Sequence, residues 1–217
     1  MAPREVFARE LQELQNQIEE MSHMVQATYK DLLDAVSIHD EVTIASIIKS
    51  DKNFYDMKKQ IEGQCLKLIT KQQPIATDLR IVSSVLKIVT DIERVGDHAE
   101  NIADMAKFLI KNDVSFSPKA QVELDKLTEL VRDNFKLSVT CRNKNDMELV
   151  DEVKDNEKAV DKMEKKYRKR HIERLANKSC KPEAGVIFLD IISNLERISD
   201  HALNIVEYVE TEIASIK

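Results

Sequence analysis

The chain has 217 residues and a formal net charge of −6, and charged residues of both signs are interspersed along it. Three glycines, four prolines and no tryptophan, with abundant Leu, Ile, Val, Glu and Lys, are typical of long helices. The composition lacks the basic footprint of a nucleic-acid-binding protein, and no apolar run approaches the ~18 residues of a membrane span. We therefore expect a cytoplasmic protein that has no nucleic-acid partner and is peripheral at most to a membrane.

Apolar residues spaced by three and four positions predict six long helices. The first three begin near Pro3, Asp40 and Pro74, with Asp40 as the N-cap of the second. The last three are expected over residues 118–142, 146–177 and 182–216. Short connections between long helices favour antiparallel neighbours. The predicted fold is therefore all-α, with two tandem pseudo-symmetric three-helix bundles at residues 1–112 and 118–217 joined by a linker at 113–117.

A segment of twelve residues occurs twice, at 91–102 and again 103 positions later at 194–205. Seven of the twelve positions are identical: Glu, Arg, Asp, His, Ala, Asn and Ile. A period of this length is too long for a solenoid repeat and indicates a duplicated domain.

Each copy carries two carboxylates four residues apart, Glu93 with Asp97 and Glu196 with Asp200. Residues at this spacing lie on the same face of a helix, where like charges repel. Glu93 and Asp97 continue an apolar stripe along their helix. Water therefore screens the repulsion between the two carboxylates only weakly. Carboxylates in such surroundings need a cation.

Neighbouring helices are expected to add further acids at the same height. If the second and third helices fold back at Pro74, residue 95 faces residue 53, close to Asp51 and Tyr55. The corresponding hairpin in the second half brings Glu157 and Asp161 beside the second pair. Oxygen ligands of this kind suit Mg, Ca, Mn, iron or, less typically, zinc.

Two alternatives compete with a metal site. Arg94, Arg197 and nearby lysines could neutralise the acids in a helical scaffold that binds no specific metal. His39 and Asp40, with His23 upstream, could instead belong to a metal-dependent all-helical phosphohydrolase. Against this second alternative, an Asn-Asp pair stands at the equivalent place in the second half, so the repeated feature is the capping Asp.

Several other side chains have less specific interpretations. His98 and His201 are expected to donate hydrogen bonds to the ligating carboxylates or to flank the helix-packing seam. Asn101 could hydrogen-bond the acid one turn earlier or stabilise a helix contact. The basic run at 165–170 is interpreted as a solvated helix face, ahead of a phosphate or nucleic-acid patch. Three isolated cysteines, Cys65, Cys141 and Cys180, are expected to be free thiols.

The paired Glu-Arg-x-x-Asp-His-Ala-x-Asn-Ile segments and Pro74-x-Ala76-x-Asp78-Leu79-Arg80 resemble the PhoU family of phosphate-uptake regulators, over nearly the whole chain. The resemblance implies multinuclear iron or zinc clusters on the two bundles. The implied ligands in this sequence are Asp51, Glu93, Asp97, Glu157, Asp161, Glu196 and Asp200. Tyr55 stands where a further acid is expected, which leaves the nuclearity of the first cluster open.

The same resemblance implies a non-enzymatic role in negative control of the phosphate regulon and of phosphate uptake. The partners it implies are the ATPase subunit of the phosphate ABC transporter and the phosphate-sensing histidine kinase. It leaves open whether the chain forms a homodimer.

Overall fold

The computed structural model describes residues 3–38, 40–72, 74–144 and 146–214. Over these ranges the chain forms six α-helices and no strand. The helices are α1 (Pro3–Ile38), α2 (Glu41–Gln72), α3 (Ala76–Lys111), α4 (Pro118–Lys144), α5 (Glu148–Ala176) and α6 (Pro182–Ala214). The predicted all-α fold with six long helices is therefore confirmed. None of these helices is apolar enough over a sufficient length to cross a bilayer in the described part of the chain.

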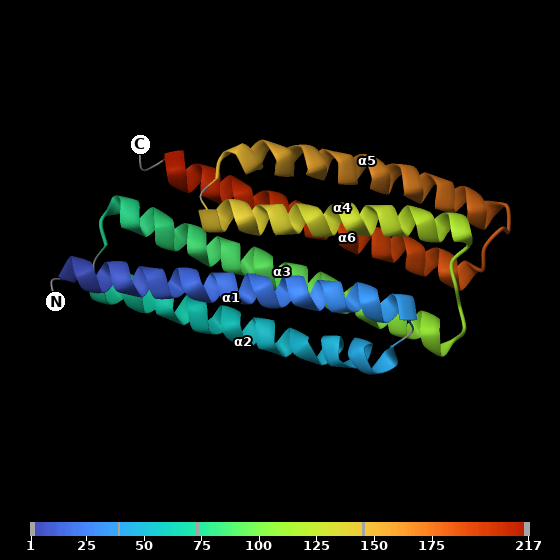
Figure 1. Ribbon diagram of the computed structural model, residues 1–217, viewed down its shortest axis with the longest axis horizontal. Helices are drawn as coiled ribbons and strands as arrows, with labels where there is room; N and C mark the ends of the chain where they lie inside the picture. The colour runs from blue at the N-terminus through green and yellow to red at the C-terminus, as the bar shows by residue number, and fades with distance from the viewer. Residues whose placement is uncertain (1–2, 39, 73, 145, 215–217) are drawn as a thin grey trace.

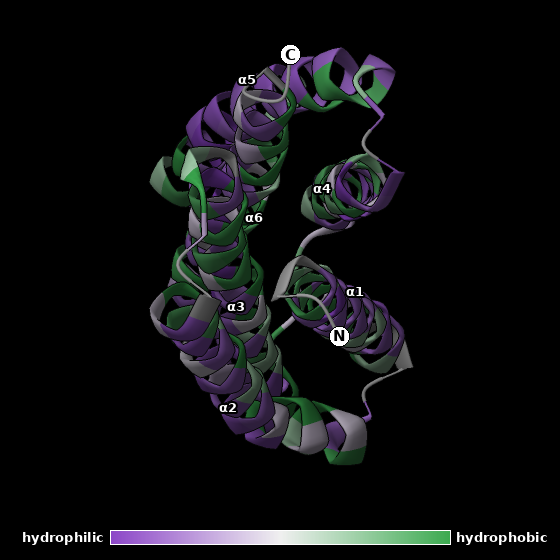
Figure 2. Cartoon of the chain, turned by 90° about the vertical axis from the view of Figure 1, so that its left-hand side faces the viewer, coloured by the Kyte–Doolittle hydropathy of each residue, from purple (hydrophilic) through white to green (hydrophobic). Residues whose placement is uncertain are grey.

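The helices run side by side along the long axis of the molecule (Figure 1). Seen from one end, α2, α3, α6 and α5 form a curved layer, and α1 and α4 lie on its concave side (Figure 2). In the first half α1 packs against α2 and α3, and in the second half α4 packs against α5 and α6. The two halves meet mainly where α3 packs along α6.

Buried aliphatic side chains at helical spacing explain this packing. The seam predicted for the third helix is buried in α3, including Ile88, Ile92, Val95 and Ala99. The main core cluster contains residues of all six helices, so the halves share one core across the α3–α6 contact. Burial of these side chains supplies the main driving force for the fold. The domain boundaries given above stay a prediction.

Two aspartates accept hydrogen bonds from amides at helix starts in the two halves, Asp40 directly before α2 and Asp146 directly before Met147, the N-cap residue of α5. Asp40 Oδ1 accepts hydrogen bonds from the backbone amides of Val42 at 3.0 Å and Thr43 at 3.2 Å, at the start of α2. Asp146 Oδ1 accepts one from the amide of Glu148 at 3.1 Å, at the start of α5. Each cap satisfies amides that have no partner inside the helix, as predicted for Asp40.

Candidate metal sites between paired helices

The α5–α6 hairpin brings four of the predicted acids together. Oxygen atoms of Glu157, Asp161 and Asp200 lie within 4.8 Å of one another, and all three side chains are partly buried. Among the described residues this is the one group of three His, Cys, Asp or Glu side chains close enough to share a metal ion. The fourth acid, Glu196, lies one helical turn before Asp200 on α6. Burial, followed by the charges of Asp200 and Asp161, raises the pKa of Glu196.

Glu157, Asp161, Glu196 and Asp200 form the second cluster, in the second half of the chain. Repulsion among these four carboxylates exceeds their attraction to nearby cations. Burial raises the pKa of Glu157 and of Asp200, and in both the charge of Asp161 raises it further. Lys165 Nζ pairs with Asp161 at 2.7 Å, but its side chain is 73% exposed, so water screens most of this contact. In the described part of the chain no cation forms an ion pair with Glu157, Glu196 or Asp200. Lys158 and Arg197 act on these carboxylates without forming ion pairs, and burial and the neighbouring acids outweigh them. The cluster therefore retains net negative charge.

The first cluster lies between α2 and α3. Burial, followed by the charge and a hydrogen bond of Asp97, raises the pKa of Asp51, and Glu93 adds to the effect. One carboxylate oxygen of Asp51, Oδ1, is buried without a hydrogen-bond partner. Three predicted acids, Asp51, Glu93 and Asp97, are therefore brought together here as well.

Two basic side chains already pair with this first cluster. Lys58 Nζ lies 3.0 Å from Glu93 Oε2, and the side chains are only 14% and 8% exposed. Arg94 Nη1 donates a hydrogen bond to Asp97 Oδ2 at 2.8 Å. Tyr55, in the place of the missing acid, is half exposed, with Lys59 over its ring. The interpretation that internal cations neutralise the acids thus fits the first cluster better than the second.

Three charged residues at the clusters were missed from the sequence. Burial, followed by the charge of Asp51, raises the pKa of Glu100, which extends the first cluster along α3. Glu164 adds negative charge near Glu196 and is itself paired with Arg168. Glu100 follows Asp97 by three residues on the same helix face, so a search for spacings of three as well as four would have found it. No spacing in the sequence could have identified Lys58, because its ion pair with Glu93 depends on the contact between α2 and α3.

The donor set fits a hard cation. All candidate ligands are carboxylates, which suit Mg, Mn, Ca or iron, whereas zinc more often takes nitrogen or sulfur ligands. The unpartnered Oδ1 of Asp51 and the crowded oxygens of the second cluster both offer lone pairs to such an ion. Of the two, the second cluster combines the closer oxygens with the fewer competing cations.

The repeated histidines lie in the α3–α6 contact, away from the carboxylate pairs. His98 Nδ1 is 2.9 Å from Asn194 Oδ1, and His201 Nδ1 is 2.6 Å from Asp91 Oδ1. Asn204 Nδ2 also donates to Asp91, at 3.0 Å. Of the two roles expected for the histidines, the structure supports flanking the helix seam and not hydrogen-bonding the ligands. Asn101 likewise stabilises a helix contact, donating weakly to Asn194 at 3.4 Å.

A glycine sets the spacing between α2 and α3. A Cβ atom at Gly96 would lie 2.7 Å from Cδ2 of the buried Phe54 ring. The contact places residue 54 opposite residue 96, two residues away from the pairing of 96 with 52 that folding at Pro74 predicts. Gly96 thereby permits the close approach that aligns Asp51 with Glu93 and Asp97.

The residues of the phosphohydrolase alternative are not assembled into a site in the described chain. Both carboxylate oxygens of Asp40 accept hydrogen bonds from the first turn of α2. His23 is 62% exposed on α1, near Glu19. His39 lies outside the described residues.

Comparison with known proteins places this geometry in a family. The PhoU domain matches residues 18–106 and 124–209. A phosphate-specific transport system accessory protein PhoU homolog of Clostridium acetobutylicum is 32% identical over 205 residues, covering 94% of this chain and 92% of the relative. PhoU homolog 1 of Thermotoga maritima is 28% identical over 210 residues, with 94% and 89% coverage.

Solved structures agree with this match. The crystal structure of PhoU from Pseudomonas aeruginosa superposes with a TM-score of 0.89 at 25% identity, covering 96% of this chain and 99% of that one. The phosphate transport system regulatory protein PhoU from Streptococcus pneumoniae has a TM-score of 0.86 at 24% identity, with 95% and 96% coverage. The second likeness concerns the fold alone.

Proposed function

The chain belongs to the PhoU family, and from this premise we propose that it is a metal-binding negative regulator of phosphate uptake and of the phosphate regulon. Its homologues are named as accessory proteins of the phosphate-specific transport system. The proposed role is non-enzymatic and works through protein contacts. The partners are the ATPase subunit of the phosphate ABC transporter and the phosphate-sensing histidine kinase.

The carboxylates of the second cluster carry the metal part of the proposal. Oxygens of Glu157, Asp161 and Asp200 lie within 4.8 Å of one another, and burial and mutual repulsion raise the pKa of two of them. A metal ion held there, with Glu196 as a fourth ligand, supplies the missing positive charge. Two ligands come from α5 and two from α6, so occupancy would fix these helices to each other.

Iron is the metal that the ligand chemistry and the family resemblance jointly favour, with zinc, Mn, Mg and Ca as alternatives. The first cluster, with Asp51, Glu93 and Asp97, is a weaker site because Lys58 and Arg94 occupy two of its carboxylates. We therefore propose that metal content is unequal between the halves, with most of it in the second.

Elemental analysis tests the metal assignment. Protein purified without a metal-affinity step is compared with Glu196→Gln/Asp200→Asn and with a control, Glu183→Gln/Glu207→Gln, which removes two exposed acids from the same helix. The proposal expects iron or another cation in the wild type and the control, and loss of most of it in the cluster variant. Equal metal in all three proteins would exclude the second cluster.

Co-purification tests the partner assignment. The chain carrying a small affinity tag is recovered from phosphate-replete cells, and the bound proteins are identified. The proposal expects the transporter ATPase, the sensor kinase or both. Recovery of neither would overturn the assignment of partners while leaving the metal assignment to be judged on its own measurement.

A further inference from the structure

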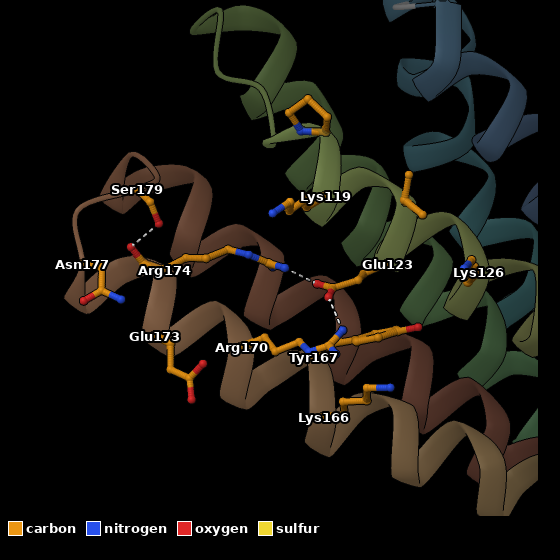
Figure 3. Close-up of a pocket in the computed structure, with 12 residues that line it drawn as sticks. Lys119, Glu123, Lys126, Lys166, Tyr167, Arg170, Glu173, Arg174, Asn177 and Ser179 are labelled. Carbon is orange, nitrogen blue, oxygen red and sulfur yellow. Dashed lines mark hydrogen bonds and ion pairs between the residues drawn. The ribbon is translucent and has the colours of Figure 1, made fainter.

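A groove outside the carboxylate clusters separates the start of α4 from the end of α5. It has a volume of about 840 Å³, within the ~300–1,000 Å³ range of small-molecule sites. Its lining runs from Pro118 to Lys126 on α4 and from Lys166 onward on α5 (Figure 3). None of the predicted metal ligands contributes to it.

The groove is basic although the chain as a whole is acidic. Its charged lining consists of five cations and two acids: Lys119, Lys126, Lys166, Arg170, Arg174, Glu123 and Glu173. This gives a local charge of three positive on a chain whose formal net charge is −6. Glu173 also points away from the other charged side chains in Figure 3. The field inside the groove therefore attracts anions.

The cations form two facing rows. Lys166, Arg170 and Arg174 follow one another at steps of four on α5, so they share one helix face and extend over about 12 Å. Lys119 and Lys126 face them from α4, about 10 Å apart along the axis. Lys119 extends toward Arg174 in Figure 3. A strip of this length exceeds what one phosphate ion can contact.

Glu123 orients the two arginines at the floor of the groove. Its carboxylate accepts hydrogen bonds from Arg170 Nη1 at 2.9 Å and from Arg174 Nη2 at 2.6 Å. Arg174 Nη1 also donates to Nδ1 of the buried His171 at 3.2 Å. The guanidinium of Arg174 is held in place from two sides, which lowers the entropy cost of binding a ligand.

The three lysines of the groove are not held in this way. In the described part of the chain, no ion pair is formed by Lys119, Lys126 or Lys166. All three side chains are exposed. Their ammonium groups remain available to an anion.

We propose that the α4–α5 groove binds a linear phosphate chain of at least two or three phosphoryl groups, as in inorganic tripolyphosphate or a nucleoside triphosphate. Arg170, whose side chain is 49% exposed, offers its remaining guanidinium N–H groups to phosphoryl oxygens, and the largely buried Arg174 adds a fixed positive charge beneath them. The lysines act as point charges on both sides. The basic run at 165–170 thus contributes Lys166 and Arg170 to a phosphate site, while Lys165 and Lys169 remain on a solvated face. The inference is independent of the proposed metal site.

A small phosphorylated ligand fits better than an acidic protein helix. A helix bound in a groove needs an apolar row to receive its anchors. The lining offers only Pro118 and Val122 as aliphatic contacts, and Tyr167 is largely buried. The recognition elements are otherwise charged or polar.

Calorimetric titration of the full chain tests this inference, with tripolyphosphate, ATP, orthophosphate and a poly-glutamate peptide as probes in metal-free buffer. The groove variant is Lys119→Gln/Lys166→Gln. Its control, Lys136→Gln/Lys169→Gln, removes two exposed lysines from the same helices outside the groove. We expect tripolyphosphate to bind wild type and control alike and the groove variant about tenfold or more weakly.

Two further variants make the result specific. Glu123→Gln removes the negative charge at the floor but keeps an oxygen that can accept hydrogen bonds from the arginines, so it is expected to bind tripolyphosphate more tightly. Glu196→Gln/Asp200→Asn is expected to bind it as wild type does, which separates the groove from the metal cluster. Equal affinity for tripolyphosphate and ATP would identify the phosphate chain as the recognised part, and tighter ATP binding would add the nucleoside.

Several outcomes would overturn the inference. They are binding of orthophosphate as tight as that of tripolyphosphate, equal loss in the groove variant and its control, and binding of poly-glutamate alone. Absence of binding by both tripolyphosphate and ATP would also overturn it. Thermal unfolding of each variant verifies the fold, and the exposed lysine substitutions are expected to leave it unchanged.

Discussion

The imidazole rings of His98 and His201 stack at the contact between α3 and α6, with centroids 5.5 Å apart and planes 25° from parallel. The two histidines occupy the same position in the two copies of the repeated segment. Each binds the first residue of the opposite copy, His98 to Asn194 and His201 to Asp91. The repeated segment therefore joins the two halves through its histidine and holds the carboxylate pairs on its other face.

Asp91 is expected to be the stronger of these two cross-copy acceptors. Asp91→Ala leaves His201 and Asn204 without their acceptor in a largely buried contact and should lower the free energy of unfolding by about 1–3 kcal/mol. Asp91→Asn, which copies the residue of the second segment, keeps an acceptor oxygen and should cost less than half as much. Urea denaturation measures both. An alanine variant within 0.5 kcal/mol of the wild type would contradict the assigned role.

Substituting alanine for two glycines on neighbouring helices should change the stability of the protein in opposite directions. A Cβ at Gly63 meets no atom within 4 Å, so Gly63→Ala gains helix propensity and should stabilise the protein by about 0.5–1 kcal/mol. Gly96→Ala places its methyl group against the Phe54 ring and should destabilise it by about 1–3 kcal/mol. Thermal unfolding compares the two variants. If Gly96→Ala were also stabilising, the close approach of α2 and α3 would not be tight.

Lys58 and Glu93 should be energetically coupled in the folded protein. Because both side chains are largely buried, Lys58→Met leaves Glu93 with only the 55% exposed Arg94, whose Nε lies 4.0 Å from its carboxylate, and should cost up to about 3–5 kcal/mol. Adding Glu93→Leu should recover most of the loss, since the buried charge is then gone. A double-mutant cycle by chemical denaturation gives the coupling energy. Additive effects of the two changes would mean that water or another cation compensates Glu93.

His171 should make the protein sensitive to acid. Burial, followed by the charge of Arg174, lowers the pKa of His171 to about 4 from its ordinary 6.5. The unfolded chain therefore binds a proton below pH 6.5 that the folded chain resists. The stability contributed by neutral His171 is complete above pH 6.5 and is lost as pH falls toward 4, by up to about 3 kcal/mol.

His171→Phe removes this titration and can still stack on Phe188, whose ring centroid lies 4.0 Å from that of His171. Unfolding free energies of the two proteins between pH 7 and pH 4 should differ in slope, with the wild type losing more stability. Parallel profiles would show that His171 is protonated in the folded state over this range.

The parts of the site that sequence could predict are those set by one helix or one hairpin. Glu93 and Asp97 share a face because of the helical repeat, and folding at Pro74 fixes their height against Asp51. The contacts of Asp91 with His201 depend on how the halves pack, which periodicity along one chain does not encode. Lys58 could not be predicted either, because its ion pair depends on which side of α2 packs against Glu93. The groove also depends on packing between helices, because Lys119 and Arg174 come from α4 and α5.

The most direct test of metal binding by the second cluster is the metal dependence of thermal unfolding. Chelated wild-type protein and Glu196→Gln/Asp200→Asn are unfolded thermally at pH 7, before and after addition of ferrous or other divalent ions. Burial and mutual repulsion raise the pKa values of Glu196 and Asp200, so ionisation of both costs stability in the metal-free fold at pH 7. We expect the chelated variant to melt at a higher temperature than the chelated wild type, and added metal to raise the melting temperature of the wild type alone. A wild type that does not respond to any of these ions, or a variant that responds equally, would contradict it.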